Sequence, residues 1–221
     1  MVGNKQEFIG KRFLTDSCVM LSYLMIDCYD RIIFRDLKPE NLAFDLRGDM
    51  RLFDFGLAKE LKQKDMVEAP DGFNATGLTG SRRYMAPEVI LCKNYGLSAD
   101  VYSYAVLVWE VFSDRIPFPN MSLDKHFERV VLKHKRPKTI KSLPKEMHNI
   151  LDNAWSHERS ERPPFTSICE RLASQIELLN YYNTNANACN ITSDRTAQLT
   201  NRSLRSRLES NDDSFVNSDE L

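Results

Sequence analysis

The sequence has no apolar run long enough to cross a membrane. The longest, VYSYAVLVWEVF at residues 101–112, is far shorter than the ~20 residues that a membrane-spanning helix requires. A run that is apolar on all sides is typical of a helix buried in the centre of a domain. The N-terminal residues MVGNKQEFIGKRF also lack the apolar segment of a secretory signal. We therefore expect a cytoplasmic protein without a membrane partner.

Cysteine pairs and a marked excess of charge are also missing. The 5 cysteines include no C-x-x-C pair, which argues against a zinc site and against a disulfide framework. We expect these cysteines to be reduced and mostly buried as small hydrophobic residues. The 4 histidines lack metal-ligand spacing, so we expect them at the surface. A net charge of −1 gives no electrostatic footprint for nucleic acid.

The pattern of apolar residues predicts a largely helical chain. Helices are predicted at residues 13–32, 98–113, 122–134, 144–155 and 167–179. Ser167 and Glu170 have the spacing of a capping box for the last helix. Core packing is the expected role of Trp109 and Trp155.

The remaining segments are predicted to form a hairpin, a loop and a tail. Short apolar runs on both sides of a turn predict a β-hairpin around residues 41–55. Residues 57–85 show no sustained period, which predicts a long loop that is either functional or disordered. After Tyr182 the composition shifts to Asn, Ser, Thr, Arg and Asp, so we expect residues 183–221 to be mostly disordered.

Residues 32–45, IIFRDLKPENLAFD, contain the groups that phosphoryl transfer requires. The reaction needs an acceptor for the proton of the attacking hydroxyl, positive charge near the phosphate, and oxygen ligands for Mg²⁺. Asp36, Lys38 and Asn41 supply one group of each kind. D-x-K-x-x-N alone is a weak signal, because such residues also cap turns.

Further motifs follow in order along the chain. DFG occupies residues 54–56, directly after an apolar run, and APE occupies residues 86–88 at the end of the long loop. Asp100 begins the apolar helix, and Arg162 lies in SERPPF. The ordered set R-D-L-x-x-x-N, D-F-G and A-P-E resembles the protein kinase family. DLKPEN resembles serine/threonine kinases, and RRYMAPEV and DVYSYAVLVWEV resemble their tyrosine-kinase-like branch.

The resemblance implies roles for the matching residues in catalysis. Asp36 corresponds to the catalytic base, and Lys38 to the group that stabilises the γ-phosphate and the transition state. Asn41 and Asp54 correspond to the Mg²⁺ ligands. The implied cofactors are therefore ATP and Mg²⁺, and the implied partner is a protein substrate.

Regulatory residues are implied in the same way. Arg35 corresponds to the arginine that grips a phosphorylated activation loop, for which Thr76 and Thr79 are the candidate phosphosites. Ser81 occupies the position where serine/threonine kinases carry a threonine facing Asp36.

Other matching positions concern the scaffold. Glu88 and Arg162 correspond to a buried ion pair that fixes geometry, and Asp100 to the aspartate that holds the backbone of the catalytic loop. Phe34 replaces the usual histidine, and we expect its ring to pack against the phenylalanine of DFG without a hydrogen-bonding role. Ala43 is smaller than the apolar residue usual beneath the adenine ring.

The resemblance covers only the C-terminal lobe. The chain contains no G-x-G-x-x-G-x-V and no V-A-I-K lysine, and 12 residues before the first predicted helix are too few for a small lobe. The expected fold is a mainly α, protein kinase-like C-terminal lobe at residues 13–182, with a small β-hairpin at the catalytic cleft. A short extension at 1–12 precedes it, and the tail at 183–221 follows.

Two functions stay open at this point. The intact motifs favour a serine/threonine protein kinase, truncated so that the isolated chain has little or no activity. The absent nucleotide-covering parts favour a non-catalytic, pseudokinase-like C-lobe that binds proteins through its substrate-docking surface. In both cases the surface that normally meets the small lobe is expected to be exposed and to favour self-association.

Overall fold

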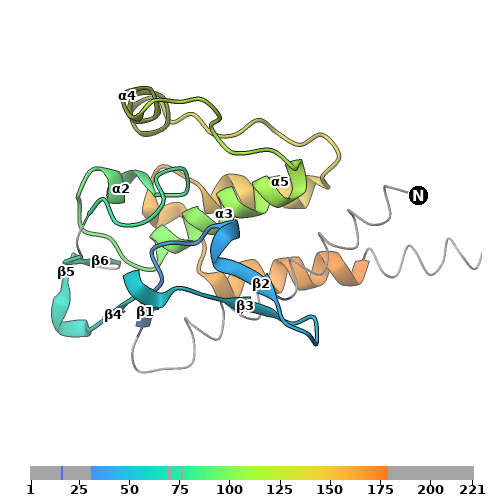
Figure 1. Ribbon diagram of the computed structural model, residues 1–221, viewed down its shortest axis with the longest axis horizontal. Coiled ribbons are helices and arrows are strands. Elements are labelled where there is room, and N and C mark those ends of the chain that lie inside the picture. Colours follow the sequence, from blue (N-terminus) through green and yellow to red (C-terminus); the bar gives the residue numbers. More distant parts are fainter. Residues whose placement is uncertain (1–15, 17–30, 69–70, 76, 179–221) are drawn as a thin grey trace, which may run out of the picture. The chain divides into compact units, whose positions relative to one another are not determined.

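The structure is a computed structural model that describes residues 16, 31–68, 71–75 and 77–178. The chain forms two compact units, Met1–Gln175 and Ile176–Leu221, and the described residues belong almost entirely to the first. This unit contains short helices, longer helices and small sheets (Figure 1). Within the described ranges, no helix is both long and apolar enough to cross a membrane. The predicted tail at 183–221 lies outside them.

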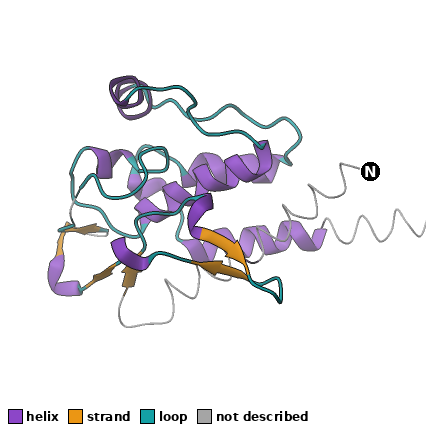
Figure 2. Cartoon of the chain, in the orientation of Figure 1, coloured by secondary structure: helices purple, strands orange, loops and turns teal. Residues whose placement is uncertain are grey.

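Among the described residues, the strands form three antiparallel pairs, all before Asn74 in the chain (Figure 2). They are β1 (Arg31–Ile33) with β4 (Lys59–Leu61), β2 (Leu42–Phe44) with β3 (Met50–Leu52), and β5 (Met66–Glu68) with β6 (Gly72–Phe73). The β2–β3 pair confirms the hairpin predicted around residues 41–55. In its turn, Asp45 Oδ1 accepts hydrogen bonds from the backbone N–H groups of Arg47 and Asp49.

Two predictions about this region were wrong. Residues 57–85 are not simply a loop, because β4, β5 and β6 lie within them. These strands have two or three residues each, too few to show a period in the sequence. The predicted helix at 13–32 lies mostly outside the described residues. Asp16 is helical, but the chain is already a strand at Arg31, so the predicted end of this helix was wrong.

Short helical turns connect several of the strands: η1 (Pro39–Asn41), η2 (Phe55–Leu57) and η3 (Gln63–Asp65). Two further short helices lie after the strands, α2 (Pro87–Ile90) and η5 (Arg159–Glu161). Proline stands at the first position of both η1 and α2, where its fixed φ favours a helical start and its missing N–H costs nothing.

The central helix α3 (Ser98–Ser113) has the bounds that the sequence predicts. All of its residues from Ala99 to Trp109 are buried, as expected for a helix that is apolar on all sides. It packs against α5 (Lys145–Ala154), which begins after Pro144 as predicted. Trp109 and Trp155 are both buried, which confirms their expected place in the core.

The other predicted helices differ from the structure in detail. Around 122–134 the chain forms α4 (Leu123–His126) and then the wider π-helix η4 (Phe127–Leu132), so the helix is confirmed but its change of pitch was not predicted. The last described helix covers residues 165–178. Because it begins directly after Pro164, Ser167 lies inside it, and the predicted capping box was wrong.

Two expectations about burial were also wrong. His126 is 3% exposed, because its ring packs edge-to-face on Phe118 with 5.3 Å between the ring centroids. Cys92 is exposed, since it follows α2 in a left-handed turn with φ 54°. Gly77 approaches that turn closely: a Cβ on Gly77 would lie 2.7 Å from the Cys92 sulfur.

The first turn of α3 holds the segment that follows β1. Asp100 is 1% exposed, and its carboxylate accepts hydrogen bonds from the backbone N–H groups of Phe34 (2.6 Å) and Arg35 (2.9 Å). Burial raises the pKa of Asp100 from 3.8 to about 7, although these two donors act in the opposite direction. α3 therefore fixes the backbone direction of the residues that lead into Asp36.

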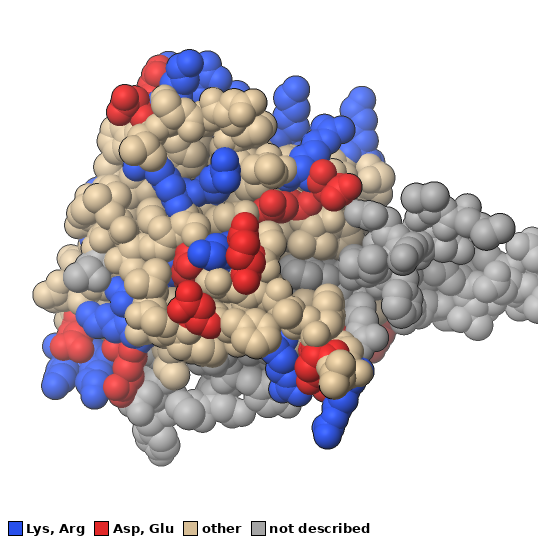
Figure 3. Space-filling view, in the orientation of Figure 1, with Lys and Arg blue, Asp and Glu red and all other residues tan. Residues whose placement is uncertain are grey.

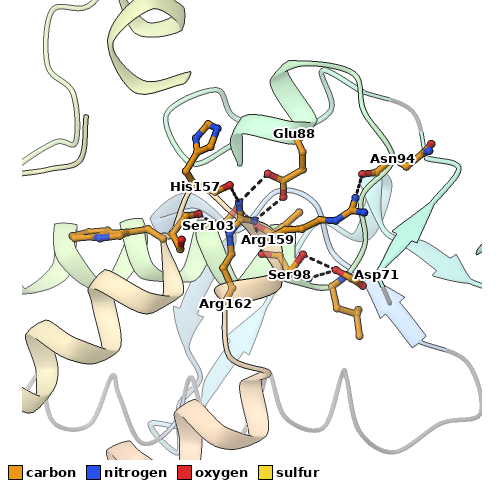
Figure 4. Close-up of polar contacts among 12 residues, drawn as sticks. Asp71, Glu88, Asn94, Ser98, Ser103, His157, Arg159 and Arg162 are labelled. Atoms are coloured by element: carbon orange, nitrogen blue, oxygen red, sulfur yellow. Dashed lines mark hydrogen bonds and ion pairs between the residues drawn. The ribbon is translucent and has the colours of Figure 1, made fainter. Parts of the chain in front are cut away.

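A buried ion pair joins α2 to the segment after η5. Arg162 Nη1 and Nη2 lie 2.6 and 2.9 Å from the two carboxylate oxygens of Glu88, and the Arg162 side chain is fully buried (Figure 4). The guanidinium also donates to the backbone carbonyls of Ser98, Ser156 and His157. Because its N–H groups are all used in this way, the charge is desolvated without being left unpaired.

A third contact ties the long segment before α2 to the start of α3. Asp71 accepts hydrogen bonds from the backbone N–H of Leu97 (3.0 Å) and of Ser98 (2.9 Å), and from the Ser98 hydroxyl (2.5 Å) (Figure 4). A Cβ on Gly96 would lie 2.1 Å from Asp71 Oδ1, so only glycine admits this approach. The start of α3 thus holds two segments: the one after β1, through Asp100, and the one before α2, through Asp71.

Replacing Arg162 with alanine tests the buried ion pair. We expect Arg162→Ala to lower the free energy of unfolding by about 3–5 kcal/mol, because Glu88 would remain buried without its partner. Urea denaturation measures the loss. Arg171→Ala is the matched control: its pair with Glu146 is about one-third exposed on both sides and is worth less than about 1 kcal/mol. Equal losses in the two variants would contradict this account.

The pH dependence of stability tests the burial of Asp100. Its raised pKa means that the folded chain keeps a proton that the unfolded chain releases, so this stabilisation is complete below pH 3.8 and is lost as pH rises to about 7. The loss amounts to at most about 1.4 kcal/mol per pH unit. Asp100→Asn, which cannot titrate, should flatten this part of the curve. Parallel curves for the two proteins in urea denaturation would show that Asp100 does not titrate there.

Candidate active site

Asp36, Lys38 and Asn41 converge in the segment between β1 and β2. Lys38 Nζ lies 2.7 Å from Asp36 Oδ2, and the Asn41 side-chain amide donates to the same oxygen (3.1 Å) and to the Asp36 carbonyl (2.9 Å). Asp36 and Asn41 are buried. The short helix η1 brings this about, since it turns the chain back so that residues 36 and 41 face each other.

The second oxygen of Asp36 is bound from the segment before α2. Asp36 Oδ1 accepts a hydrogen bond from the backbone N–H of Ser81 (2.7 Å), and Lys38 Nζ donates to the Ser81 hydroxyl (3.1 Å). The expectation that Ser81 faces Asp36 is thereby confirmed. Gly80 permits this contact: its φ is +103°, and a Cβ there would lie 2.1 Å from the Arg35 carbonyl oxygen.

These contacts set the charge state of the pair. Burial by itself raises the pKa of Asp36, but hydrogen bonds from Lys38 and Ser81 outweigh it and hold that pKa below its usual value. The hydrogen bond to Asp36 likewise raises the pKa of Lys38. Asp36 is therefore a carboxylate at neutral pH, beside a fixed positive charge, and it is oriented by donors from two separate segments.

Asp54 lies at the same end of the β2–β3 hairpin as Asn41. Leu42 pairs with Leu52 in the ladder, and the backbone N–H of Phe53 donates to the Asn41 carbonyl (2.9 Å). Asp54 itself has left-handed backbone angles (φ 59°), its carboxylate accepts from Gly56 N–H (3.2 Å), and its side chain is exposed. A carboxylate and an amide, both suitable as oxygen donors to a hard cation, thus occupy neighbouring positions.

The DFG phenylalanine packs where the sequence predicts. The rings of Phe34 and Phe55 meet edge-to-face, with centroids 5.3 Å apart and an angle of 84° between their planes. Phe34 is 1% exposed and therefore fills core volume without a polar role. Arg35 Nε donates to the Leu57 carbonyl (2.5 Å), so the segment after DFG is tied to the loop at Arg35 as well.

The candidate phosphosites are only partly covered by the structure. Thr76 lies outside the described residues. Thr79 is partly buried and its hydroxyl donates to the Gly77 carbonyl (3.3 Å). Thr79 and Arg35 line the same small cavity, which Asp100 also borders.

Sequence reasoning missed a pocket beside Lys38. It has a volume of about 510 Å³ and is lined by residues of the segment before α2, including Arg82 and Arg83, and by residues around α4, including His126. Tyr84 closes part of it, held by a hydrogen bond from its hydroxyl to Glu110 (2.5 Å). The adjacent pair Arg82-Arg83 was the available signal, but the burial of His126 could not be read from the sequence.

Comparison with known proteins agrees with this arrangement. Residues 6–172 match the family described as "Protein kinase domain". The serine/threonine-protein kinase STY46 of Arabidopsis thaliana is 35% identical over 157 residues, 71% of this chain and 25% of that protein. The dual specificity protein kinase shkC of Dictyostelium discoideum is 33% identical over 166 residues, 75% of this chain and 32% of that protein.

A receptor is among the relatives too. Macrophage colony-stimulating factor 1 receptor 2 of Takifugu rubripes is 31% identical over 139 residues, 62% of this chain and 13% of the receptor. The chain thus spans a third or less of the length of each of these three relatives. Since the family match covers most of the 221 residues, this chain belongs to the protein kinase family.

Proposed function

We propose that this chain carries the catalytic-loop side of a serine/threonine protein kinase, which transfers the γ-phosphoryl group of ATP to protein hydroxyls. The observation that carries the proposal is the environment of Asp36. Its carboxylate is ionised, buried and oriented by Lys38, Asn41 and the Ser81 backbone. Such orientation is what a proton acceptor in phosphoryl transfer requires, because the reaction depends on positioning and electrostatics.

Each group near Asp36 has a part in this proposal. Asp36 accepts the proton of the substrate hydroxyl and directs that hydroxyl toward the phosphate. Lys38, whose ammonium lies 2.7 Å from Asp36, stabilises the negative charge that develops on the transferred group. Asn41 keeps the Asp36 carboxylate in place through its side-chain amide.

ATP and Mg²⁺ are the cofactors we propose, in keeping with the family. Asn41 and Asp54 would supply the protein ligands to Mg²⁺, and the phosphates and water would supply the others. Within the described ranges, no group of three or more His, Cys, Asp or Glu side chains is arranged to hold a metal ion. A two-ligand site shared with phosphates fits that finding, since Mg²⁺ is commonly bound in this way in kinases.

Preference for serine and threonine is the finer part of the proposal. Lys38 in DLKPEN, and Ser81 in contact with both Asp36 and Lys38, support it. The relatives include a serine/threonine-protein kinase and a dual specificity protein kinase. We propose further that the C-terminal lobe of the kinase domain covers residues 13–182. The long segment before α2 would act as an activation loop, with Thr76 and Thr79 as phosphosites and Arg35 as their partner.

Phosphoryl transfer would require, besides these residues, the segments of a kinase that cover the phosphates of ATP. The 221 residues contain neither G-x-G-x-x-G-x-V nor a V-A-I-K lysine, and active kinases need that lysine paired with a glutamate. We therefore expect little or no phosphotransfer from these residues alone.

The second candidate function is a non-catalytic module that binds proteins. It is favoured by exposed large apolar side chains in the β2–β3 hairpin and in the turn that follows it, which we call the hairpin set: Phe44, Leu46, Phe53, Phe55 and Leu57. Their exposed fractions range from 37% for Leu57 to 108% for Leu46. Large apolar side chains that are exposed to water favour association with another surface.

Binding of Mg²⁺-ATP distinguishes the two functions. For a kinase lobe we expect Mg²⁺-ATP to raise the melting temperature of the chain by about 3–5 °C at roughly ten times its Kd. Asp54→Ala should abolish the shift, because it removes a metal ligand. Asp36→Asn should keep the shift and lower any phosphotransfer to background. Differential scanning fluorimetry and transfer of radiolabelled phosphate to a serine peptide measure the two effects.

The same experiment can overturn the kinase proposal. No thermal shift in the unaltered chain would favour the binding module. A shift that persists in Asp54→Ala would place the nucleotide elsewhere, and phosphotransfer that survives Asp36→Asn would exclude Asp36 as the base.

Because the residues of the hairpin set are exposed, we also predict that the purified chain self-associates. Sedimentation velocity should show dimers or larger species whose proportion rises with concentration, and the double variant Leu46→Ser/Phe53→Ser should shift the equilibrium toward monomer. Leu132→Ser, which changes a 58% exposed leucine on η4, is the matched control and should leave association unchanged. A monomer at high concentration before any substitution would refute the prediction.

A further inference from the structure

The pocket beside Lys38 has an unusual lining for a surface hollow. Three cationic side chains border it, Lys38, Arg82 and Arg83, while Glu40 is the one acidic residue in its lining. On the face shown in Figure 3, basic and acidic residues are otherwise interspersed. Because positive charge predominates in this concave lining, the pocket favours an anionic occupant.

Buried donors without partners line the same pocket. His126 is 3% exposed, and neither of its ring nitrogens has a hydrogen-bond partner. The Nε of Arg82 is also buried and unpaired, although Arg82 Nη2 donates to the Leu123 carbonyl (3.0 Å). Buried polar groups are usually satisfied, so unpaired groups at the wall of a pocket indicate a missing acceptor.

The charge state of His126 is consistent with this reading. Burial, together with the nearby Arg82 and Arg83, lowers the pKa of His126 to about 4. The ring is therefore neutral at pH 7 and carries one N–H. The pocket thus offers an acceptor two guanidinium groups beside a buried neutral imidazole, and it repels a cationic side chain.

We infer that this pocket binds an anionic side chain of the protein substrate, a carboxylate or a phosphate, close to the acceptor hydroxyl. The inference rests on the proposed kinase function, because it assumes that the hydroxyl lies at Asp36. Lys38 contacts Asp36 and also borders the pocket, so a peptide whose hydroxyl reaches Asp36 has neighbouring residues within range of Arg82 and Arg83. The substrates would then be acidic or already phosphorylated near the acceptor.

Peptide binding to the 221-residue chain tests this inference without need of phosphotransfer. Fluorescein-labelled serine peptides carry alanine, lysine, glutamate or phosphoserine at each position flanking the acceptor, and anisotropy gives their Kd at fixed ionic strength. At one or more positions we expect glutamate or phosphoserine to bind about tenfold more tightly than alanine, and lysine to bind more weakly. Preference for both anions indicates recognition of charge, and preference for phosphoserine alone indicates a phosphate site.

Variants assign the preference to the pocket. Arg82→Gln and Arg83→Gln should each reduce it severalfold, whereas Arg47→Gln, an exposed arginine in the β2–β3 turn, should leave it unchanged. Glutamine keeps a donor for the Leu123 carbonyl, so Arg82→Gln preserves local structure. His126→Leu removes an unpaired buried group and should keep or raise the melting temperature while it weakens binding of the anionic peptide. If His126 had only a structural role, its replacement would lower the melting temperature and the affinity for the anionic peptide together.

Two outcomes would overturn the inference. One is equal affinity for anionic and alanine peptides at all positions. The other is a preference that persists in both Arg82→Gln and Arg83→Gln. Failure of the proposed function gives a different result: the chain would show no response to Mg²⁺-ATP, yet the preference for anionic peptides and its loss in the pocket variants would remain.

Discussion

The buried carboxylate of Asp100 is the contact on which the candidate site depends. Its two oxygens bind consecutive backbone N–H groups, those of Phe34 and Arg35, and so fix the direction in which the chain enters the loop. Arg35 has φ 71°, an unfavourable angle for a side chain with a Cβ. The hydrogen bonds that Asp100 accepts offset that cost, and the resulting bend sets Asp36 against Ser81. The orientation of Asp36 is thus determined by backbone that α3 holds.

The same helix also organises the second wall of the site. Asp71 binds the first turn of α3, and Arg162 joins Glu88 in α2 to the Ser98 carbonyl at its start. Both ends of the segment that contains Ser81 are therefore anchored to the helix that holds Asp36. Since Asp36 accepts hydrogen bonds from both walls, a change at either anchor alters its surroundings, even though neither anchor touches it.

The resemblance to kinase motifs led to two expected contacts that the structure contains: Asp100 holds the backbone of the segment after β1, and Ser81 lies against Asp36. Asp36, Asn41 and Asp100 have fixed partners in backbone and side chains, so the sequence positions determine the contacts. The burial of His126 depends instead on Phe118, with which it shares no periodic pattern. The short strands β4 to β6 depend on pairing between distant segments, and strands of two or three residues carry no period. Tertiary contacts determine the burial of His126 and the positions of these short strands, so the local sequence does not predict them.

Positive charge links the candidate base to the pocket beside it. Lys38 binds Asp36 and the Ser81 hydroxyl, and it also borders the cavity that Arg82 and Arg83 line. An anion in that pocket would compete with Asp36 for interaction with the Lys38 ammonium. A phosphate bound above the loop would do the same. Each added anion therefore weakens the hold of Lys38 on Asp36, which makes the carboxylate more basic. Because hydrogen bonds from Lys38 and Ser81 hold the pKa of Asp36 below its usual value, such anions would raise that pKa toward the basicity that proton transfer needs.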